Sequence, residues 1–160
     1  MTLTAAHLAD LAEHAASIFD GKCVEQFAAL CLRTAASGER LALLITSRET
    51  KRWVIPKGWP IKGLLPHEVA EREAWEEAGV KGKAAEQSFG TYTYLKKLDD
   101  GTEIPAFVEV HVLEVRCTKN KFPERHERTV AWVTLVEAVG MVSEPELQGL
   151  FRKLAALSVG

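Results

Sequence analysis

Three glutamates stand within five residues of one another in the segment REAWEEAGV, residues 72–80, at positions 73, 76 and 77. If this segment is helical, positions i, i+3 and i+4 fall within an arc of roughly 100° on one face. Like charges at this spacing repel each other at a cost of roughly a few tenths of a kcal/mol per pair. Because carboxylate oxygens are ligands that Mg²⁺ prefers, the spacing indicates a face that binds a divalent cation.

A solvated helix face is the alternative interpretation of an E-x-x-E-E pattern that stands alone. Two neighbouring features favour the metal site. A loop punctuated by Gly58, Pro60 and Gly63 leads into the segment, and Arg72 lies one turn before Glu76, where it can orient a carboxylate. A cation between carboxylates and a pyrophosphate would neutralise charge in the transition state and activate a water, whose proton another carboxylate could accept.

The segment GWPIKGLLPHEVAEREAWEEAGV, residues 58–80, resembles the Nudix box, G-x5-E-x7-R-E-U-x-E-E-x-G-U, in which U is apolar. Leu64 stands where the box has its first glutamate, and we expect this departure to tune activity rather than abolish it. The resemblance implies the Nudix fold, an α/β (α+β) domain whose mixed β-sheet is sandwiched between α-helices. The other eight fixed positions match: Gly58, Arg72, Glu73, Ala74, Glu76, Glu77, Gly79 and Val80.

The same resemblance implies a divalent metal, Mg²⁺ or Mn²⁺, and its ligands. Glu73 and Glu77 would hold the ion, and Glu76 would be the catalytic base or a further ligand. A backbone carbonyl at Lys57 or Gly58 would complete the coordination shell. The reaction implied is hydrolysis of a phosphoanhydride bond by an activated water.

The identity of the base stays open at this level. Glu76 and Glu77 exchange roles among Nudix enzymes, and Arg72 joins the catalytic group by the resemblance. Some members take the base from a later loop, where this chain offers Glu124 and Glu127. For those two residues, an ordinary solvated loop charge is the alternative.

Segments outside the box, FAALCLR, ITSRETKRWVIPKG and ERHERTVAWVTLVEAV, resemble the diphosphoinositol polyphosphate phosphohydrolase branch of the family, which also splits diadenosine polyphosphates. This favours a dinucleoside polyphosphate or a diphosphoinositol polyphosphate as the anionic substrate. ADP-ribose-like or other nucleoside diphosphate derivatives are the alternative, and a non-catalytic domain that senses a phosphorylated ligand is an alternative from another class. Residues expected at substrate phosphates are Ser47, Arg48, Lys57, Gly58 and Arg128.

The elements that must position these residues follow from periodicity and turn signals. Apolar runs predict strands over 27–33, 40–47, 52–56 and 129–135, and the central helix over 66–78. A turn at Asp99-Asp100-Gly101 predicts a hairpin of strands within 90–98 and 103–115. Two capping boxes, Thr134-x-x-Glu137 and Ser143-x-x-Glu146, predict the starts of two final helices.

The apolar spacing of residues 1–22 predicts an amphipathic helix, and residues 23–160 are expected to form a single domain. We expect the helix to pack on that domain or to join two copies in a homodimer.

The net charge is -2 and the pI near 6.2, which excludes a globally basic nucleic-acid coat, and no motif reads a base edge. No apolar run approaches the roughly 20 residues of a membrane span. Three scattered cysteines indicate a reducing, cytoplasmic compartment, with Cys31 and Cys117 expected in the core.

Overall fold

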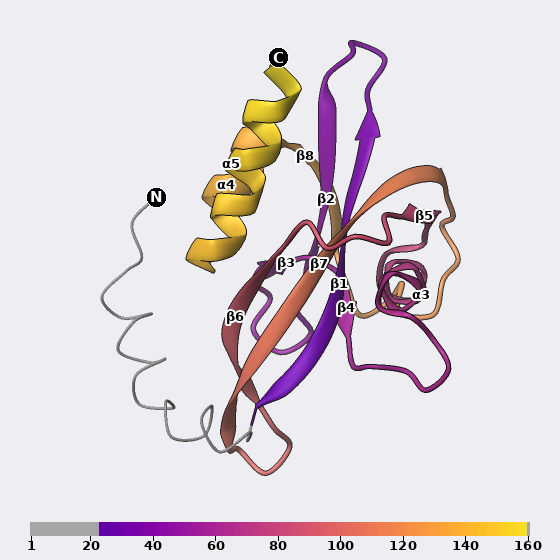
Figure 1. The fold of residues 1–160 in the computed structure, drawn as a ribbon. Helices are drawn as coiled ribbons and strands as arrows, with labels where there is room; N and C mark the ends of the chain where they lie inside the picture. Colours follow the sequence, from indigo (N-terminus) through magenta and orange to yellow (C-terminus); the bar gives the residue numbers. More distant parts are fainter. Residues whose placement is uncertain (1–22, 160) are drawn as a thin grey trace.

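The computed structural model describes residues 23–159, so the predicted amino-terminal helix and the dimer through it lie outside the described part of the chain. A mixed sheet runs through the middle, with α3 on one face and α4 and α5 on the other (Figure 1). The elements are β1 (Val24–Thr34), β2 (Arg40–Thr46), β3 (Trp53–Val54), β4 (Lys57–Gly58), α3 (Pro66–Ala78), β5 (Val80–Ala84), β6 (Gly90–Lys97), β7 (Glu103–Thr118), β8 (Val130–Thr134), α4 (Leu135–Met141) and α5 (Pro145–Val159).

Strand β1 explains why the core has two halves. It pairs in parallel with β7 and antiparallel with β2 and β4, so it lies inside the sheet. Successive side chains of a strand point to opposite faces. Leu30 and Leu32 therefore pack in the cluster that contains α4 and α5, whereas Ala29 and Cys31 pack in the cluster that contains α3. A strand covered on both faces is a continuous apolar run, as the sequence of β1 is. The predicted mixed sheet between helical layers is confirmed.

Helix α3 has the bounds that the sequence predicts. Pro66 occupies its first position, and Gly79 ends it in the left-handed region with φ 70°. The residue before the helix, Leu65, has no side-chain acceptor for the free N–H groups of the first turn. The carboxylate of Glu68 still accepts a hydrogen bond from the Leu65 N–H at 2.8 Å, which is half of a capping box.

Two strand predictions differ from the structure. The strand expected over 52–56 is shortened to β3, and a second short strand, β4, begins only after Pro56, which has no N–H to donate to a ladder. The carbonyl of Pro56 accepts instead from the Ala29 N–H at 3.0 Å. Strand β5 was not predicted, since in its sequence VKGKA only Val80 favours a strand, whereas glycine, alanine and lysine are depleted in strands. It is held by antiparallel pairing with β7.

Two further predictions were wrong. Cys117 is exposed, because the end of β7 extends beyond β1, whose pairing with β7 stops at Glu114. Ser143 does not cap the last helix, since α5 begins at Pro145. The other capping box is confirmed: Thr134 Oγ1 accepts from the Glu137 N–H at 3.1 Å. No helix among residues 23–159 is long and apolar enough to cross a membrane.

Candidate active site

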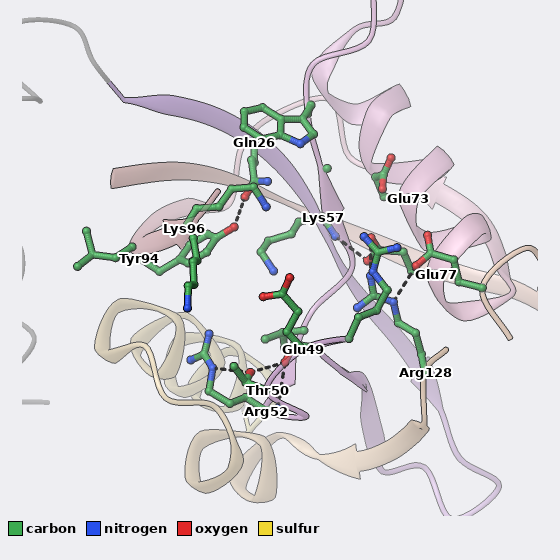
Figure 2. Close-up of a pocket in the computed structure, with 18 of the residues that line it drawn as sticks. Gln26, Glu49, Thr50, Arg52, Lys57, Glu73, Glu77, Tyr94, Lys96 and Arg128 are labelled. Carbon is green, nitrogen blue, oxygen red and sulfur yellow. Dashed lines mark hydrogen bonds and ion pairs between the residues drawn. The ribbon is translucent and has the colours of Figure 1, made fainter. Parts of the chain in front are cut away.

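A pocket of about 490 Å³ opens where α3, the loop after β4, the turn between β2 and β3, and strand β6 come together (Figure 2). Its size lies within the range of small-molecule sites, roughly 300–1,000 Å³. Four acidic residues line it, together with six cationic ones, so the walls carry an excess of positive charge. The acidic residues are Glu49, Glu73, Glu77 and Glu124; the cationic residues are Arg48, Arg52, Lys57, Lys96, Lys97 and Arg128.

Glu73 lies against the backbone of β4. A Cβ added at Gly58 would stand 2.3 Å from Glu73 Cδ and 2.5 Å from its Oε1, far inside any normal contact. Only glycine at position 58 therefore allows this carboxylate its place. Burial, followed by the charges of Glu77 and Glu76, raises the pKa of Glu73 to about 8. Burial and the two neighbouring carboxylates thus oppose the ionisation of Glu73, and a cation bound beside it would favour the charged form.

Glu77, one helical turn further along α3, is almost fully buried and held on both sides. Its Oε1 accepts a hydrogen bond from the Lys57 backbone N–H at 3.2 Å, and its Oε2 lies 3.3 Å from Arg128 Nη2. Burial raises the pKa of Glu77, and the charges of Arg128 and Lys57 oppose that rise. These contacts fix the direction of the carboxylate, so Glu73 and Glu77 face the pocket together (Figure 2).

The buried Arg128 links the loop that carries Glu124 to helix α3. Its Nε donates to Glu124 Oε1 at 3.0 Å and its Nη1 donates to the Thr46 carbonyl at 3.1 Å, in addition to the Glu77 contact. All three of its nitrogens have partners, so in this structure Arg128 orients carboxylates. The expectation that it reaches a substrate phosphate stays a prediction. Of the two later-loop glutamates, Glu124 lines the pocket and Glu127 does not.

The remaining members of the predicted catalytic set lie further out. Glu76 is partly exposed and is not among the pocket-lining residues, although its charge acts on Glu73. Arg72 is exposed and forms no ion pair with any of residues 23–159. Neither the part of Arg72 nor that of Glu76 as base or ligand is tested by this arrangement, and both stay predictions.

The donor set suits a hard divalent cation. Glu73 and Glu77 offer carboxylate oxygens at the pocket wall, and the glycine beside Glu73 leaves room for that carboxylate. Within the described chain, no three His, Cys, Asp or Glu side chains form a ready-made metal site. An ion bound here would therefore need further oxygens from backbone carbonyls, water or substrate phosphates, which is the usual pattern for Mg²⁺.

The turn between β2 and β3 places Ser47 and Arg48 at the pocket. The Ser47 hydroxyl lies 2.6 Å from Thr50 Oγ1 and accepts from the Arg52 N–H at 3.0 Å, so it builds the turn. Arg48 is largely exposed and lies 3.6 Å from Glu127. Both residues line the pocket as expected, with Lys57 and Gly58.

The far end of the pocket contains residues that the sequence did not single out. Tyr94, in β6, donates its hydroxyl to Gln26 Oε1 at 2.5 Å, and Gln26 is buried in β1. The Lys57 ammonium lies 5.1 Å from the centre of the Tyr94 ring, and the Lys96 ammonium lies 5.4 Å from that of Trp59. A buried polar residue at the start of an apolar strand, such as Gln26, is the one signal that could have marked this end.

Comparison with known proteins agrees with the resemblance of residues 58–80 to the Nudix box. The NUDIX domain family model matches residues 24–154. Diphosphoinositol polyphosphate phosphohydrolase 3-alpha of Mus musculus is 45% identical over 56 residues, which cover 35% of this chain and 34% of that protein. Nudix hydrolase 21, chloroplastic, of Arabidopsis thaliana is 36% identical over 108 residues, which cover 64% of this chain and 50% of that protein. The chain thus spans half or less of the length of these relatives.

Solved structures agree on the fold. The crystal structure of a C. elegans Ap4A hydrolase binary complex superposes with a TM-score of 0.60 at 21% identity and covers 86% of this chain and 98% of that one. At this identity the likeness concerns the arrangement of strands and helices.

Proposed function

This chain belongs to the Nudix family, and from that premise we propose that it hydrolyses a phosphoanhydride bond in a polyphosphorylated small molecule, with the help of a divalent cation. The observation that carries the proposal is the pairing of Glu73 with Glu77 on one wall of a pocket whose other charged residues are mainly cationic. Paired carboxylates need a positive partner, and the surrounding cations suit the charge of a polyphosphate.

Mg²⁺ or Mn²⁺ would be held by Glu73 and Glu77, with Glu76 and the Lys57 carbonyl as further donors. Such an ion supplies charge neutralisation at the phosphate oxygens and lowers the pKa of a water bound to it. The chain's own residues do the rest. Arg128 keeps Glu77 directed into the pocket, and the Lys57 N–H fixes its second oxygen. Ser47, Arg48, Lys57 and Gly58 line the pocket, which supports their proposed contact with substrate phosphates.

The proton of the attacking water needs a carboxylate acceptor within reach. Glu76 is the candidate from the box, and Glu124 is the candidate from the later loop. The position of Glu124 in the pocket wall, with its Oε1 held by Arg128, supports the second candidate. The variants Glu76→Gln and Glu124→Gln separate them, because only loss of the base should lower kcat strongly while the affinity for Mn²⁺ stays close to that of the parent chain.

The substrates that the proposal favours are dinucleoside polyphosphates and diphosphoinositol polyphosphates. The names of the mouse and C. elegans relatives point to these two classes. ADP-ribose-like compounds are the next class to examine. A cytoplasmic site of action and a homodimer through residues 1–22 remain parts of the proposal that the sequence alone supports.

The test is a turnover assay with diadenosine polyphosphates, a diphosphoinositol polyphosphate and ADP-ribose, each with Mg²⁺ or Mn²⁺ and each with excess chelator. We expect metal-dependent release of product and its loss in Glu77→Gln. Turnover in oxygen-18 water then identifies the phosphorus attacked. Absence of turnover over the whole panel would favour a non-catalytic phosphate sensor, and undiminished turnover in Glu73→Gln and Glu77→Gln would refute the assignment of the site.

A further inference from the structure

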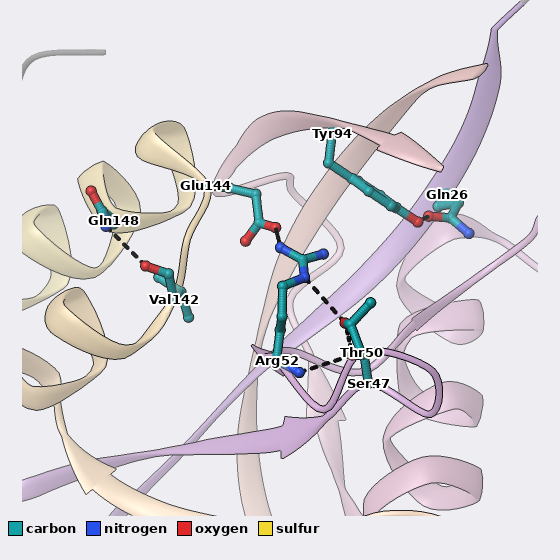
Figure 3. A network of polar contacts seen from close by, with 8 residues as sticks. All are labelled: Gln26, Ser47, Thr50, Arg52, Tyr94, Val142, Glu144 and Gln148. Atoms are coloured by element: carbon teal, nitrogen blue, oxygen red, sulfur yellow. Dashed lines mark hydrogen bonds and ion pairs between the residues drawn. The ribbon is translucent and has the colours of Figure 1, made fainter. Parts of the chain in front are cut away.

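The end of the pocket away from α3 contains a cation with an unusual support. Arg52 stands between the turn at residues 47–51 and strand β3, and it lines the pocket. Its Nη1 lies 3.1 Å from Oε2 of Glu144, a residue 92 positions later in the chain (Figure 3). The side chain of Glu144 is 6% exposed and that of Arg52 is 42% exposed, so a buried acid supports a cation that reaches the open pocket.

Several contacts hold this pair in place. The Arg52 N–H donates to Ser47 Oγ at 3.0 Å, and its Nε donates to Thr50 Oγ1 at 3.3 Å. A backbone bridge joins Trp53, the next residue, to Val142, two residues before Glu144. The strand that follows Arg52 and the connection between α4 and α5 that carries Glu144 are therefore fixed to each other. After these bonds, Nη2 of Arg52 has no partner among the described residues.

Glu144 itself is unfavourable for the stability of the fold at this position. Its Oε1 is buried and accepts no hydrogen bond from any residue in the described range. A buried carboxylate oxygen without a hydrogen bond lowers the stability of the fold. A buried ion pair is weak evidence for a gain in stability, because well-packed apolar residues in place of the whole pair are often as stable. What the structure shows of Glu144 is that its other oxygen holds Arg52.

A second cation, Lys96, is presented at the same end of the pocket in a different way. It follows Tyr92 and Tyr94 at every second position of β6, so its side chain leaves the sheet on the face that Tyr94 occupies. Its ammonium lies over the Trp59 ring, and no carboxylate of residues 23–159 forms an ion pair with it. An aromatic face attracts an ammonium without using its N–H donors in hydrogen bonds, so they remain available to an anion.

We propose that Arg52 and Lys96 form a second phosphate subsite at the end of the pocket away from α3, and that Glu144 is the positioning residue that holds Arg52 in it. This rests on the proposed function, and it deepens that function, because the ligand must carry phosphate beyond the bond that is cleaved. The subsite would bind that remote phosphate through the free donors of the guanidinium and the ammonium.

The test is direct binding of inorganic tripolyphosphate to the full chain by calorimetry in the presence of EDTA, with a check that the ligand stays intact. Lys96→Met and Arg52→Ala should each raise Kd about tenfold, the loss of one charge-assisted contact. Lys81→Met and Lys153→Met are matched controls, because each ammonium also lies over an aromatic ring, at 4.7 Å and 4.4 Å, but outside the pocket. Both controls should keep the Kd of the parent chain.

Glu144→Gln gives the sharper result, because two explanations predict opposite signs. If Glu144 acted only as a nearby negative charge, its removal would make a polyanion bind more tightly. If it holds Arg52, binding should weaken about fivefold, and the same substitution should add nothing in an Arg52→Ala background. A Kd that is unchanged or lower in Glu144→Gln overturns the positioning role, as does an equal loss in both backgrounds.

Binding of the remote phosphate and cleavage of a substrate are measured separately, so either can be absent without the other. A chain that binds tripolyphosphate through Arg52 and Lys96 but cleaves no substrate keeps the subsite and loses the hydrolase assignment. A chain that cleaves polyphosphates while Lys96→Met and Arg52→Ala bind tripolyphosphate like the parent chain refutes the subsite and keeps the hydrolase.

Discussion

The contact between Gly58 and Glu73 allows a strict test of the site, by the substitution Gly58→Ala. The added methyl would stand 2.3 Å from Glu73 Cδ, and ordinary contact begins at 3.4 Å, so the carboxyl group must retreat by about 1 Å. What blocks the methyl is the end of a flexible side chain, so the fold can accommodate it. A displacement of about 1 Å at a reacting centre costs on the order of 100-fold in rate.

We therefore expect Gly58→Ala to lower kcat/KM about 100-fold, by loss of correct positioning. The affinity for Mn²⁺, measured by calorimetry, should fall as well, because a displaced Glu73 is a poorer ligand. The free energy of unfolding should change by less than about 1 kcal/mol, since the methyl also restricts the unfolded chain. The substrate is whichever member of the panel shows the highest turnover.

Gly140→Ala is the matched control. The same methyl at Gly140, in α4, meets nothing within 4 Å, so activity and Mn²⁺ affinity should stay at the level of the parent chain. A further check combines Gly58→Ala with Glu73→Gln. If the methyl acts by displacing Glu73, the double variant should lose little more than Glu73→Gln alone. The reasoning fails if Gly58→Ala retains full kcat/KM and Mn²⁺ affinity, or if the two losses simply multiply.

Three more predictions follow from the contacts of α3. Glu77→Gln keeps an acceptor for the Lys57 N–H but removes the charge, so kcat/KM should fall about 100-fold; a loss well below tenfold would contradict its role. Arg128→Ala leaves Glu77 and Glu124 without their cation, so the free energy of unfolding in urea should fall by about 3–5 kcal/mol. A fall below about 1 kcal/mol would contradict the role of Arg128 in holding both carboxylates. The third prediction concerns pH, in the presence of EDTA. The pKa of Glu73 is about 8 in the folded chain, against an ordinary value of 4.5, so the folded chain binds this proton more tightly than the unfolded chain does. The contribution of Glu73 to stability is therefore full below about pH 4.5 and declines up to about pH 8. The difference in melting temperature between Glu73→Gln and the parent should grow in favour of the variant from pH 5 to about pH 8, and a constant difference would refute the assignment.

Local sequence signals were enough to predict the central helix and its acidic face. Pro66, Gly79 and the spacing of the glutamates are local signals, because a helix is set by contacts between residues three and four positions apart. The same holds for the continuous apolar run of β1, which is typical of a strand covered on both faces, and for the cap at Thr134. Local signals failed at β5, where four of five residues are poor strand formers and the strand is held by its pairing with β7.

Which of these residues contact each other depends on how distant segments of the chain pack. The sequence carries no register for the pairing of distant strands, so it could not show that Arg128 holds both Glu77 and Glu124. Nor could it show that Glu144 supports Arg52, because the connection between α4 and α5 meets the segment after β2 only when the sheet and its helical layer have packed. Burial also belongs to the assembled fold, and burial is what turns a common surface pair of charges into a fixed one. The acidic face of α3 is thus local in origin, and the cationic pocket around it is a product of long-range packing.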